Sequence, residues 1–143
     1  MPVTIRQAKE SDILAISNDI RWEDHIEVMA QGYESPKDAV SESFNRALFR
    51  FTMENNGVPI AIFGLEPLDI LGDKACVWML GTPEINKVKK TFCERSQEVI
   101  KYFMEQYPVL MAQVDSRYTK THRWLEWLGA RKGETYRLNN GFE

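Results

Sequence analysis

Apolar and polar residues alternate in the opening segment VTIRQA, which predicts a strand because successive strand side chains point to opposite faces of a sheet. Three segments with apolar residues at helical spacing follow it. Capping residues mark their ends: Ser11 at one start, Ser35 with Pro36 at another, and Gly32 at a stop. The first third is therefore predicted to be a strand and then helices, in DILAISNDIR, in WEDHIEVMAQ and from Pro36 onward.

Three consecutive strands are predicted in the middle of the chain. FRFTM and VPIAIFGLEPL are joined by Asn56-Gly57, a pair that readily adopts the positive φ angles of a tight hairpin turn. The third strand, KACVWMLG, follows a turn at Leu71-Gly72-Asp73. These segments favour an antiparallel meander.

The longest predicted helix follows this meander. Its apolar residues recur at helical spacing from Val88 to Tyr107, and Pro108 closes it. A strand, a helix stopped by Gly129 and a last strand complete the predicted order, in VLMAQVDS, TKTHRWLEWL and ETYRL.

The bulk composition predicts one soluble domain spanning residues 1–143. A chain of 143 residues, 43% of them apolar, can bury a sufficient core without a disulfide or a metal. Cys76 and Cys93 are expected to be buried free thiols in a reducing compartment. The sequence shows neither a signal-peptide pattern nor an apolar run of membrane-spanning length, so we expect a protein of the cytoplasm, or one packaged from it.

The net charge argues against nucleic-acid binding, and the spacing of metal-ligating residue types argues against a metal site. The formal net charge of −3 provides no overall field for nucleic acid, and the local basic stretch from Arg117 to Lys132 is expected to be a solvated helix with its flanks. Nucleic acid therefore ranks last among the candidate partners. No group of histidine, cysteine and acidic residues has metal-ligand spacing, so no metal site is predicted.

The order of elements resembles that of the GNAT (acyl-CoA N-acyltransferase) fold across nearly the whole chain. A narrower resemblance is to the small GNAT-like proteins of tailed phages, including the internal virion protein family of short-tailed coliphages. It is carried by the segments VWMLGT, YPVLMAQVDSRY and RWLEWLGA. The resemblance implies an α/β (α+β) fold with a central mixed sheet of about six to seven strands and about four flanking helices.

The resemblance also implies a coenzyme A site, with acetyl-CoA as the expected thioester. Two parallel strands, KACVWMLG and VLMAQVDS, would splay apart and leave backbone groups to bond the pantetheine arm. The diphosphate would lie at the N-terminus of the following helix. The cofactor-binding residues implied are Leu80, Gly81, Thr82, Asn86, Lys87 and Val88.

This turn departs from the family pattern, which reads Gln or Arg, two residues, Gly, one residue, then Gly or Ala. The segment from Thr82 to Lys87 has no glycine, so a close nest of amides is harder to form, and Glu84 adds a carboxylate. Lys87 and the two lysines after it offer cations instead. The alternative is that Thr82 caps a helix that Pro83 opens, with solvated lysines.

Acyl transfer to an amine requires a base, a donor to the thioester carbonyl and an acid for the departing thiolate. A backbone amide near Leu80 or Gly81 is the expected donor. The tyrosine that serves as the acid in many GNAT enzymes falls on Leu125, so Tyr118, at the expected strand exit, is the best remaining acid, with a packed edge tyrosine as the alternative. The candidate bases are Glu66 and His25, each with an ordinary surface role as the alternative.

Two hypotheses of function remain open. The first is an acetyl-CoA-dependent N-acetyltransferase that acts on a protein, a peptide or a small amine. The second is a non-catalytic phage virion or host-interaction protein, because a fold does not guarantee the activity that it usually hosts. Trp78 bears on the choice, since it lies on the expected cofactor strand and either walls the cleft or fills it.

Overall fold

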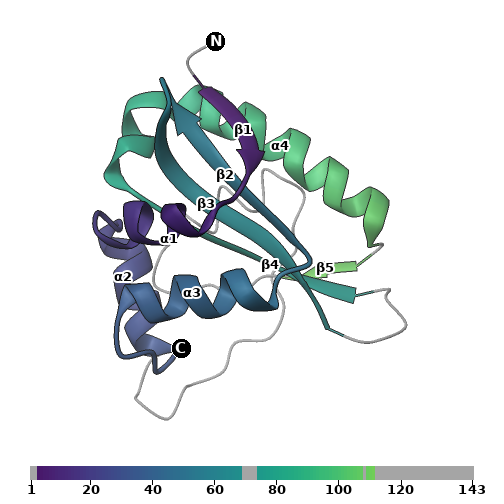
Figure 1. Cartoon of the computed structure of the whole chain (residues 1–143). Helices are drawn as coiled ribbons and strands as arrows, with labels where there is room; N and C mark the ends of the chain where they lie inside the picture. The colour runs from purple at the N-terminus through teal and green to yellow at the C-terminus, as the bar shows by residue number, and fades with distance from the viewer. Residues whose placement is uncertain (1–2, 69–73, 108, 112–143) are drawn as a thin grey trace.

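The computed structural model describes residues 3–68, 74–107 and 109–111, and within them five strands form one mixed sheet (Figure 1). The strands lie in sequence order. The first four pair antiparallel, and the fifth pairs parallel to the fourth. They are β1 (Val3–Gln7), β2 (Phe49–Asn55), β3 (Val58–Pro67), β4 (Lys74–Gly81) and β5 (Val109–Met111).

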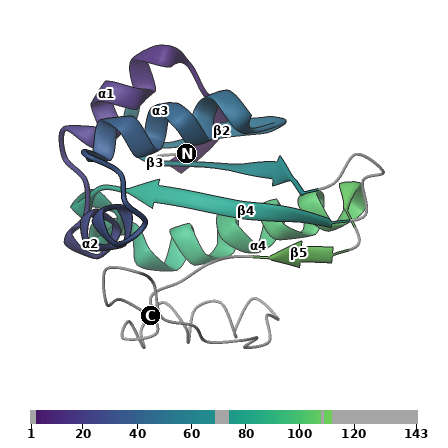
Figure 2. The same ribbon diagram turned by 90° about the horizontal axis from the view of Figure 1, so that it is seen from below.

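Helices cover both faces of this sheet (Figure 2). On one face lie α1 (Glu10–Ser17) and α3 (Pro36–Arg46), and on the other lies α4 (Lys89–Gln106). A 3₁₀ helix, η1 (Pro83–Val88), connects β4 to α4, and α2 (Trp22–Ala30) lies at the C-terminal end of β4. The predicted α/β architecture is confirmed. Its last helix and last strand, TKTHRWLEWL and ETYRL, lie outside the described residues.

A predicted helix cap and a predicted hairpin turn are both confirmed. The Ser35 hydroxyl accepts the Asp38 N–H at 3.2 Å and caps α3, with Pro36 in the first turn. Asn56 and Gly57 have φ angles of 51° and 81° and form the hairpin turn.

The predicted cap at Ser11 is wrong. Helix α1 begins at Glu10, with Lys9 in the N-cap position. The Asp12 carboxylate accepts the Lys9 N–H at 2.7 Å, and this bond fixes the start of the helix ahead of Ser11.

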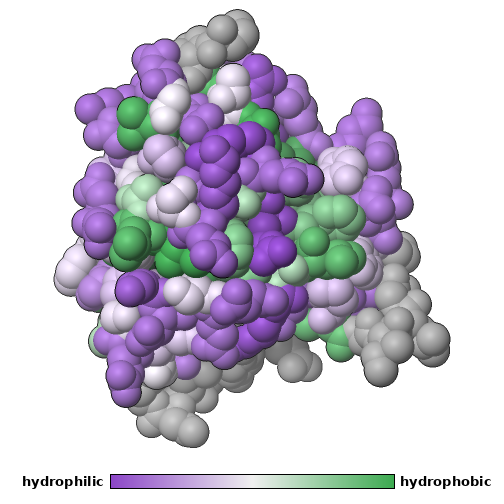
Figure 3. Space-filling model, in the orientation of Figure 1, coloured by the Kyte–Doolittle hydropathy of each residue, from purple (hydrophilic) through white to green (hydrophobic). Residues whose placement is uncertain are grey.

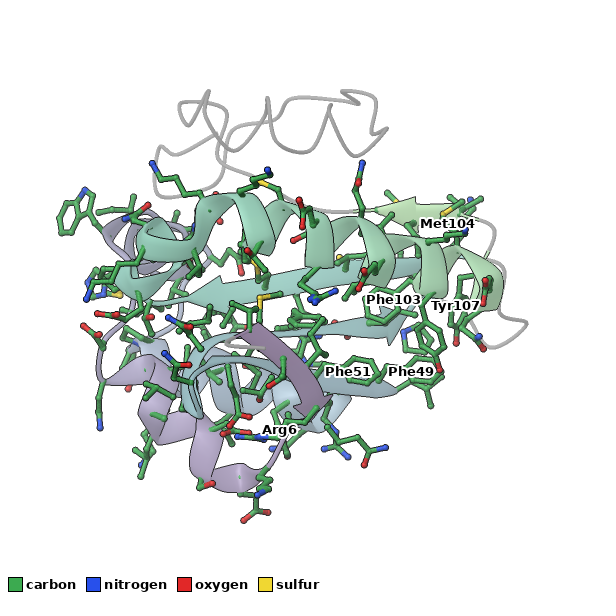
Figure 4. All side chains as sticks on the ribbon, turned by 90° about the horizontal axis from the view of Figure 1, so that it is seen from above. Arg6, Phe49, Phe51, Phe103, Met104 and Tyr107 are labelled. Atoms are coloured by element: carbon green, nitrogen blue, oxygen red, sulfur yellow. The ribbon has the colours of Figure 1, made fainter. Side chains whose placement is uncertain are left out.

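The sheet separates two apolar clusters. Alternate strand residues face opposite sides, so Ile62 packs with α1 and α3 while its neighbour Phe63 packs on the α4 side. On the α4 side, Phe49, Phe51 and Phe103 lie close together, with the Phe103 ring centroid 6.3 Å from that of Phe49 and 6.2 Å from that of Phe51 (Figure 4). Both faces are therefore buried, as an α/β layered fold requires.

A buried ion pair fastens α1 to the sheet. Asp12 is 2% exposed and accepts two bonds of 2.8 Å from the Arg6 guanidinium and one of 2.8 Å from the Thr52 hydroxyl. Burial alone would raise the pKa of Asp12, but these bonds and the Lys9 N–H outweigh it and hold the pKa below its ordinary value. Arg6 also pairs with Glu54 at 3.0 Å, so the network joins α1 to β1 and β2.

The surface over α1 and α3 is mostly hydrophilic, and its apolar side chains form separate areas (Figure 3). Across the described ranges, no helix combines the length and apolar character that crossing a bilayer requires. Those ranges also contain no cluster of three side chains suited to a metal ion.

Candidate functional site

The backbone of β4 has an edge that β5 does not cover. β3 pairs with β4 from Ala75 to Gly81, but β5 pairs only with residues 74–76. Beyond Cys76, β4 continues toward α4 without a strand partner on that side in the part of the chain that the structure describes. The predicted parallel pairing of these two strands is thus confirmed, and among the described residues it reaches Cys76.

The register shows which backbone groups face this open edge. The Leu68 N–H donates to the Lys74 carbonyl at 3.0 Å, and the Thr82 N–H donates to the Ile60 carbonyl at 2.9 Å. In an antiparallel pair, alternate residues direct both backbone groups toward the partner, so the even-numbered residues of β4 face β3. The N–H and C=O groups of the odd-numbered residues therefore face the open edge. These residues are Val77, Met79 and Gly81.

Helix α2 takes both outward groups of Gly81. The Asp24 carboxylate accepts the Gly81 N–H at 2.8 Å, and the Arg21 N–H donates to the Gly81 carbonyl at 2.7 Å. The Arg21 guanidinium bonds the same carboxylate at 2.8 and 2.9 Å, and Asp24 is 4% exposed. Figure 2 shows α2 lying across this end of β4. Within the described residues, the open edge is thus closed at Gly81 and has no backbone partner at Val77 and Met79.

The turn after β4 also uses its own amides. The Thr82 N–H and hydroxyl donate to the Ile60 carbonyl at 2.9 and 3.3 Å. The Glu84 N–H donates to the Thr82 hydroxyl at 3.3 Å, and the Ile85 N–H donates to the Thr82 carbonyl at 3.2 Å. Thr82 therefore caps η1 and Pro83 opens it. The amides expected near Gly81 and Thr82 do not form an open nest, because each has a partner within the protein.

The N-terminus of α4 follows η1 along the chain and differs from it in its charged residues. Its first turn has no acidic residue, and its N-cap residue, Val88, makes no side-chain cap bond. Lys89 and Lys90 are exposed, and neither has an ion-pair partner among the described residues. The Lys87 ammonium, by contrast, lies 3.0 Å from the Glu84 carboxylate, and Asn86 is exposed in η1. Two exposed cations without an acidic neighbour in the first turn make this end of α4 the stronger attractor for an anion.

The side chains of β4 leave the open edge clear. Leu80 is buried with α1 and α3, and Trp78 packs against that same cluster over Gly64. Trp78 is thus on the face of the sheet and does not lie in its plane, and its buried Nε1 has no hydrogen-bond partner among the described residues. Val88, at the α4 end, packs against the opposite cluster.

The candidate bases lie at different ends of β4. His25 follows Asp24 on α2, near Gly81, and its ring stacks on Trp22 with centroids 6.1 Å apart. Glu66 pairs with Cys76 at the start of β4, because β3 and β4 are antiparallel, and its carboxylate lies 3.8 Å from the Arg46 guanidinium. The structure therefore does not bring Glu66 to the strand end that His25 adjoins. The candidate acid, Tyr118, lies outside the described residues.

The Cys76 thiol does not supply a nucleophile near this site. Burial raises its pKa, and the neighbouring Glu66 carboxylate raises it further. The thiol is therefore held in its neutral form.

Sequence reasoning missed Arg21 and Asp24. The sequence pattern gives His25 a surface role as the alternative to a base and assigns no role to Asp24 beside it. One signal points the other way: Asp24 precedes Val28 by four residues, so it shares a helix face with a residue that the apolar pattern buries. Arg21, three residues before Asp24, can neutralise it there.

No family model and no curated protein matches this sequence. Solved structures do resemble it. An acetyltransferase of the GNAT family from Bacillus anthracis has a TM-score of 0.71 at 15% identity, over 99% of this chain and 90% of that one. A spermidine N-acetyltransferase SpeG chimera from Vibrio cholerae and hSSAT has a TM-score of 0.70 at 18% identity, over 100% and 91%.

A third similar structure is that of yncA from Salmonella typhimurium, described as an acetyltransferase with its cofactor acetyl-CoA. Its TM-score is 0.65 at 15% identity, over 94% of this chain and 82% of that one. Identities this low establish architecture and not activity. Together with the strand order and the layers of helices, they show that the chain has the GNAT acyltransferase fold.

Proposed function

We propose that this protein binds an acyl-CoA thioester, with acetyl-CoA the expected form, and transfers the acyl group to an amine. One observation carries the proposal: β4 continues past its last described pairing with β5 and leads through η1 to a helix N-terminus that carries two exposed lysines. An extended ligand with amide groups fits such an edge, and its diphosphate fits such a helix end. A similar fold with acetyl-CoA, that of yncA, supports this assignment.

Different residues of this chain would bind different parts of the ligand. The outward groups of Val77 and Met79 would hold the pantetheine arm, and the Met79 N–H would polarise the thioester carbonyl. Lys89 and Lys90 would hold the diphosphate. Coenzyme A supplies an activated acyl group on a thiolate leaving group.

Two side chains are proposed for proton transfer. His25, on the helix that contacts the end of β4, is our candidate for removing a proton from the acceptor ammonium. Tyr118 remains the candidate that protonates the departing thiolate. Glu66 is left out of this proposal because it lies at the opposite end of β4.

A second candidate function is a non-catalytic protein that contacts a virion or host partner. The internal bonding of the amides from Gly81 to Ile85 favours it, because those groups are not offered to a ligand. A phage or prophage origin is part of this proposal and rests on the resemblance of three segments, VWMLGT, YPVLMAQVDSRY and RWLEWLGA.

Calorimetric titration with acetyl-CoA separates the two functions. For the enzyme we expect binding at micromolar strength. We further expect the double substitution Lys89→Ala with Lys90→Ala to weaken binding about thirtyfold at low salt, since each cation near a diphosphate contributes on the order of 1 kcal/mol. Raising the ionic strength should reduce the difference.

Lys101→Ala is the matched control. It removes an exposed lysine from the same helix, about 18 Å along the axis from Lys89 at 1.5 Å per residue, and it should leave the affinity unchanged. Absence of binding at millimolar acetyl-CoA would reject the enzyme and favour the non-catalytic function.

A further inference from the structure

The bonds between Gly81 and α2 occupy a position on the open edge that the proposed ligand also needs. Met79 and Gly81 face the same edge, about 6.6 Å apart at the rise of an extended strand, and α4 begins beyond Gly81. An arm that joins an acyl group at Met79 to a diphosphate at Lys89 must therefore pass Gly81. In this structure both outward groups of Gly81 are bonded to α2.

Arg21 and Asp24 occupy this position as a ligand would. A carboxylate oxygen accepts the Gly81 N–H, and a backbone N–H donates to the Gly81 carbonyl. An amide-containing chain lying along a free strand edge makes the same pair of bonds.

We propose that Arg21 and Asp24 form an autoinhibitory latch, which holds α2 against Gly81 and must release before coenzyme A can lie along the whole edge. This inference rests on the proposed function, since it assigns a regulated state to the same site. Non-helical segments flank α2, at residues 18–21 and 31–35, and Gly32 has a φ of 93°. The helix is therefore connected on both sides through segments that can change direction without breaking a helix.

The latch has a measurable consequence for affinity. A ligand that binds only the released state shows an apparent affinity reduced by the fraction of molecules in that state. Removing the Asp24 carboxylate removes the acceptor of the Gly81 N–H and the partner of the Arg21 guanidinium. The variant should therefore bind the ligand more tightly even though its fold is less stable.

The test is calorimetric titration of Asp24→Ala with acetyl-CoA, together with its thermal unfolding. We expect the affinity to rise about tenfold relative to the parent while the unfolding temperature falls. Asp12→Asn is the matched control, because it weakens another buried aspartate–arginine pair, at β1 and β2. It should lower the unfolding temperature without raising the affinity.

A second variant keeps the test decisive if Asp24→Ala does not fold. Arg21→Met with Asp24→Leu replaces the pair by apolar side chains of similar volume and leaves no buried charge without a partner. It should also bind acetyl-CoA more tightly than the parent. Unchanged or weaker binding by the folded variants, or tighter binding by Asp12→Asn as well, would overturn the latch while leaving the proposed function intact. If neither parent nor variants bind, the proposed function fails and the latch with it.

Discussion

Met79→Pro is expected to reduce acetyl-CoA binding below detection while the sheet stays folded. The Met79 N–H faces the open edge, so proline removes no bond from the ladder with β3, and its ring projects where the pantetheine arm would lie. Two effects then act together: the loss of the proposed donor to the thioester carbonyl, and steric exclusion of the arm. Titration calorimetry measures the affinity, and circular dichroism confirms the fold.

Two other substitutions separate the backbone from the side chain. Met79→Leu keeps the N–H and most of the side-chain volume, so its affinity should match that of the parent. Leu80→Pro, one residue along, removes a group that faces β3 opposite Ile62 and should unfold the protein. Parent-like binding by Met79→Pro would show that the Met79 N–H is not part of a coenzyme A site.

Gly64→Ala is expected to lower the free energy of unfolding by about 3 kcal/mol or more, the upper range for overpacking. Gly64 lies in β3 between paired strands on both sides. An added Cβ would collide with the Phe49 carbonyl oxygen and would lie 2.7 Å from Cζ2 of Trp78. The first contact is backbone and cannot rotate away, and the indole is held by the cluster beneath α1 and α3.

Gly57→Ala is the comparison for this prediction. Its φ of 81° strains an alanine by about 1–2 kcal/mol, but nothing lies within 4 Å of the added Cβ. Urea denaturation of both variants should therefore show the larger loss at Gly64, where the backbone φ is ordinary. Equal losses at the two positions would contradict the packing around Gly64.

Elements whose causes lie within a few residues could be predicted from the sequence. The Ser35-Pro36 start of α3 and the Asn56-Gly57 turn are of this kind, since a cap or a turn is fixed by its own side chains. The predicted start of α1, at Ser11, is too late in the chain. Asp12, a residue inside the helix, accepts the Lys9 N–H, and this bond fixes an earlier start. The parallel pairing of β4 and β5 followed from the resemblance to a known fold and not from local pattern.

The candidate site was harder to predict because its bonds span long stretches of chain. The Gly81 N–H and the Asp24 carboxylate are 57 residues apart, and no periodic pattern in the sequence predicts their contact. The placement of Glu66 could have been anticipated. A hairpin between β3 and β4 sets the end of one strand against the start of the other, which moves Glu66 away from Gly81.

Amide hydrogen exchange at single residues of β4, measured by NMR with and without acetyl-CoA, tests whether the outward amides of this strand bind the ligand. We expect fast exchange at Val77 and Met79 in the free protein and strong protection of both on binding. Trp78 and Leu80, which face β3, should be protected in both states. Protection of Val77 and Met79 that is already complete in the free protein, or exchange that acetyl-CoA leaves unchanged, would contradict a coenzyme A site on this edge.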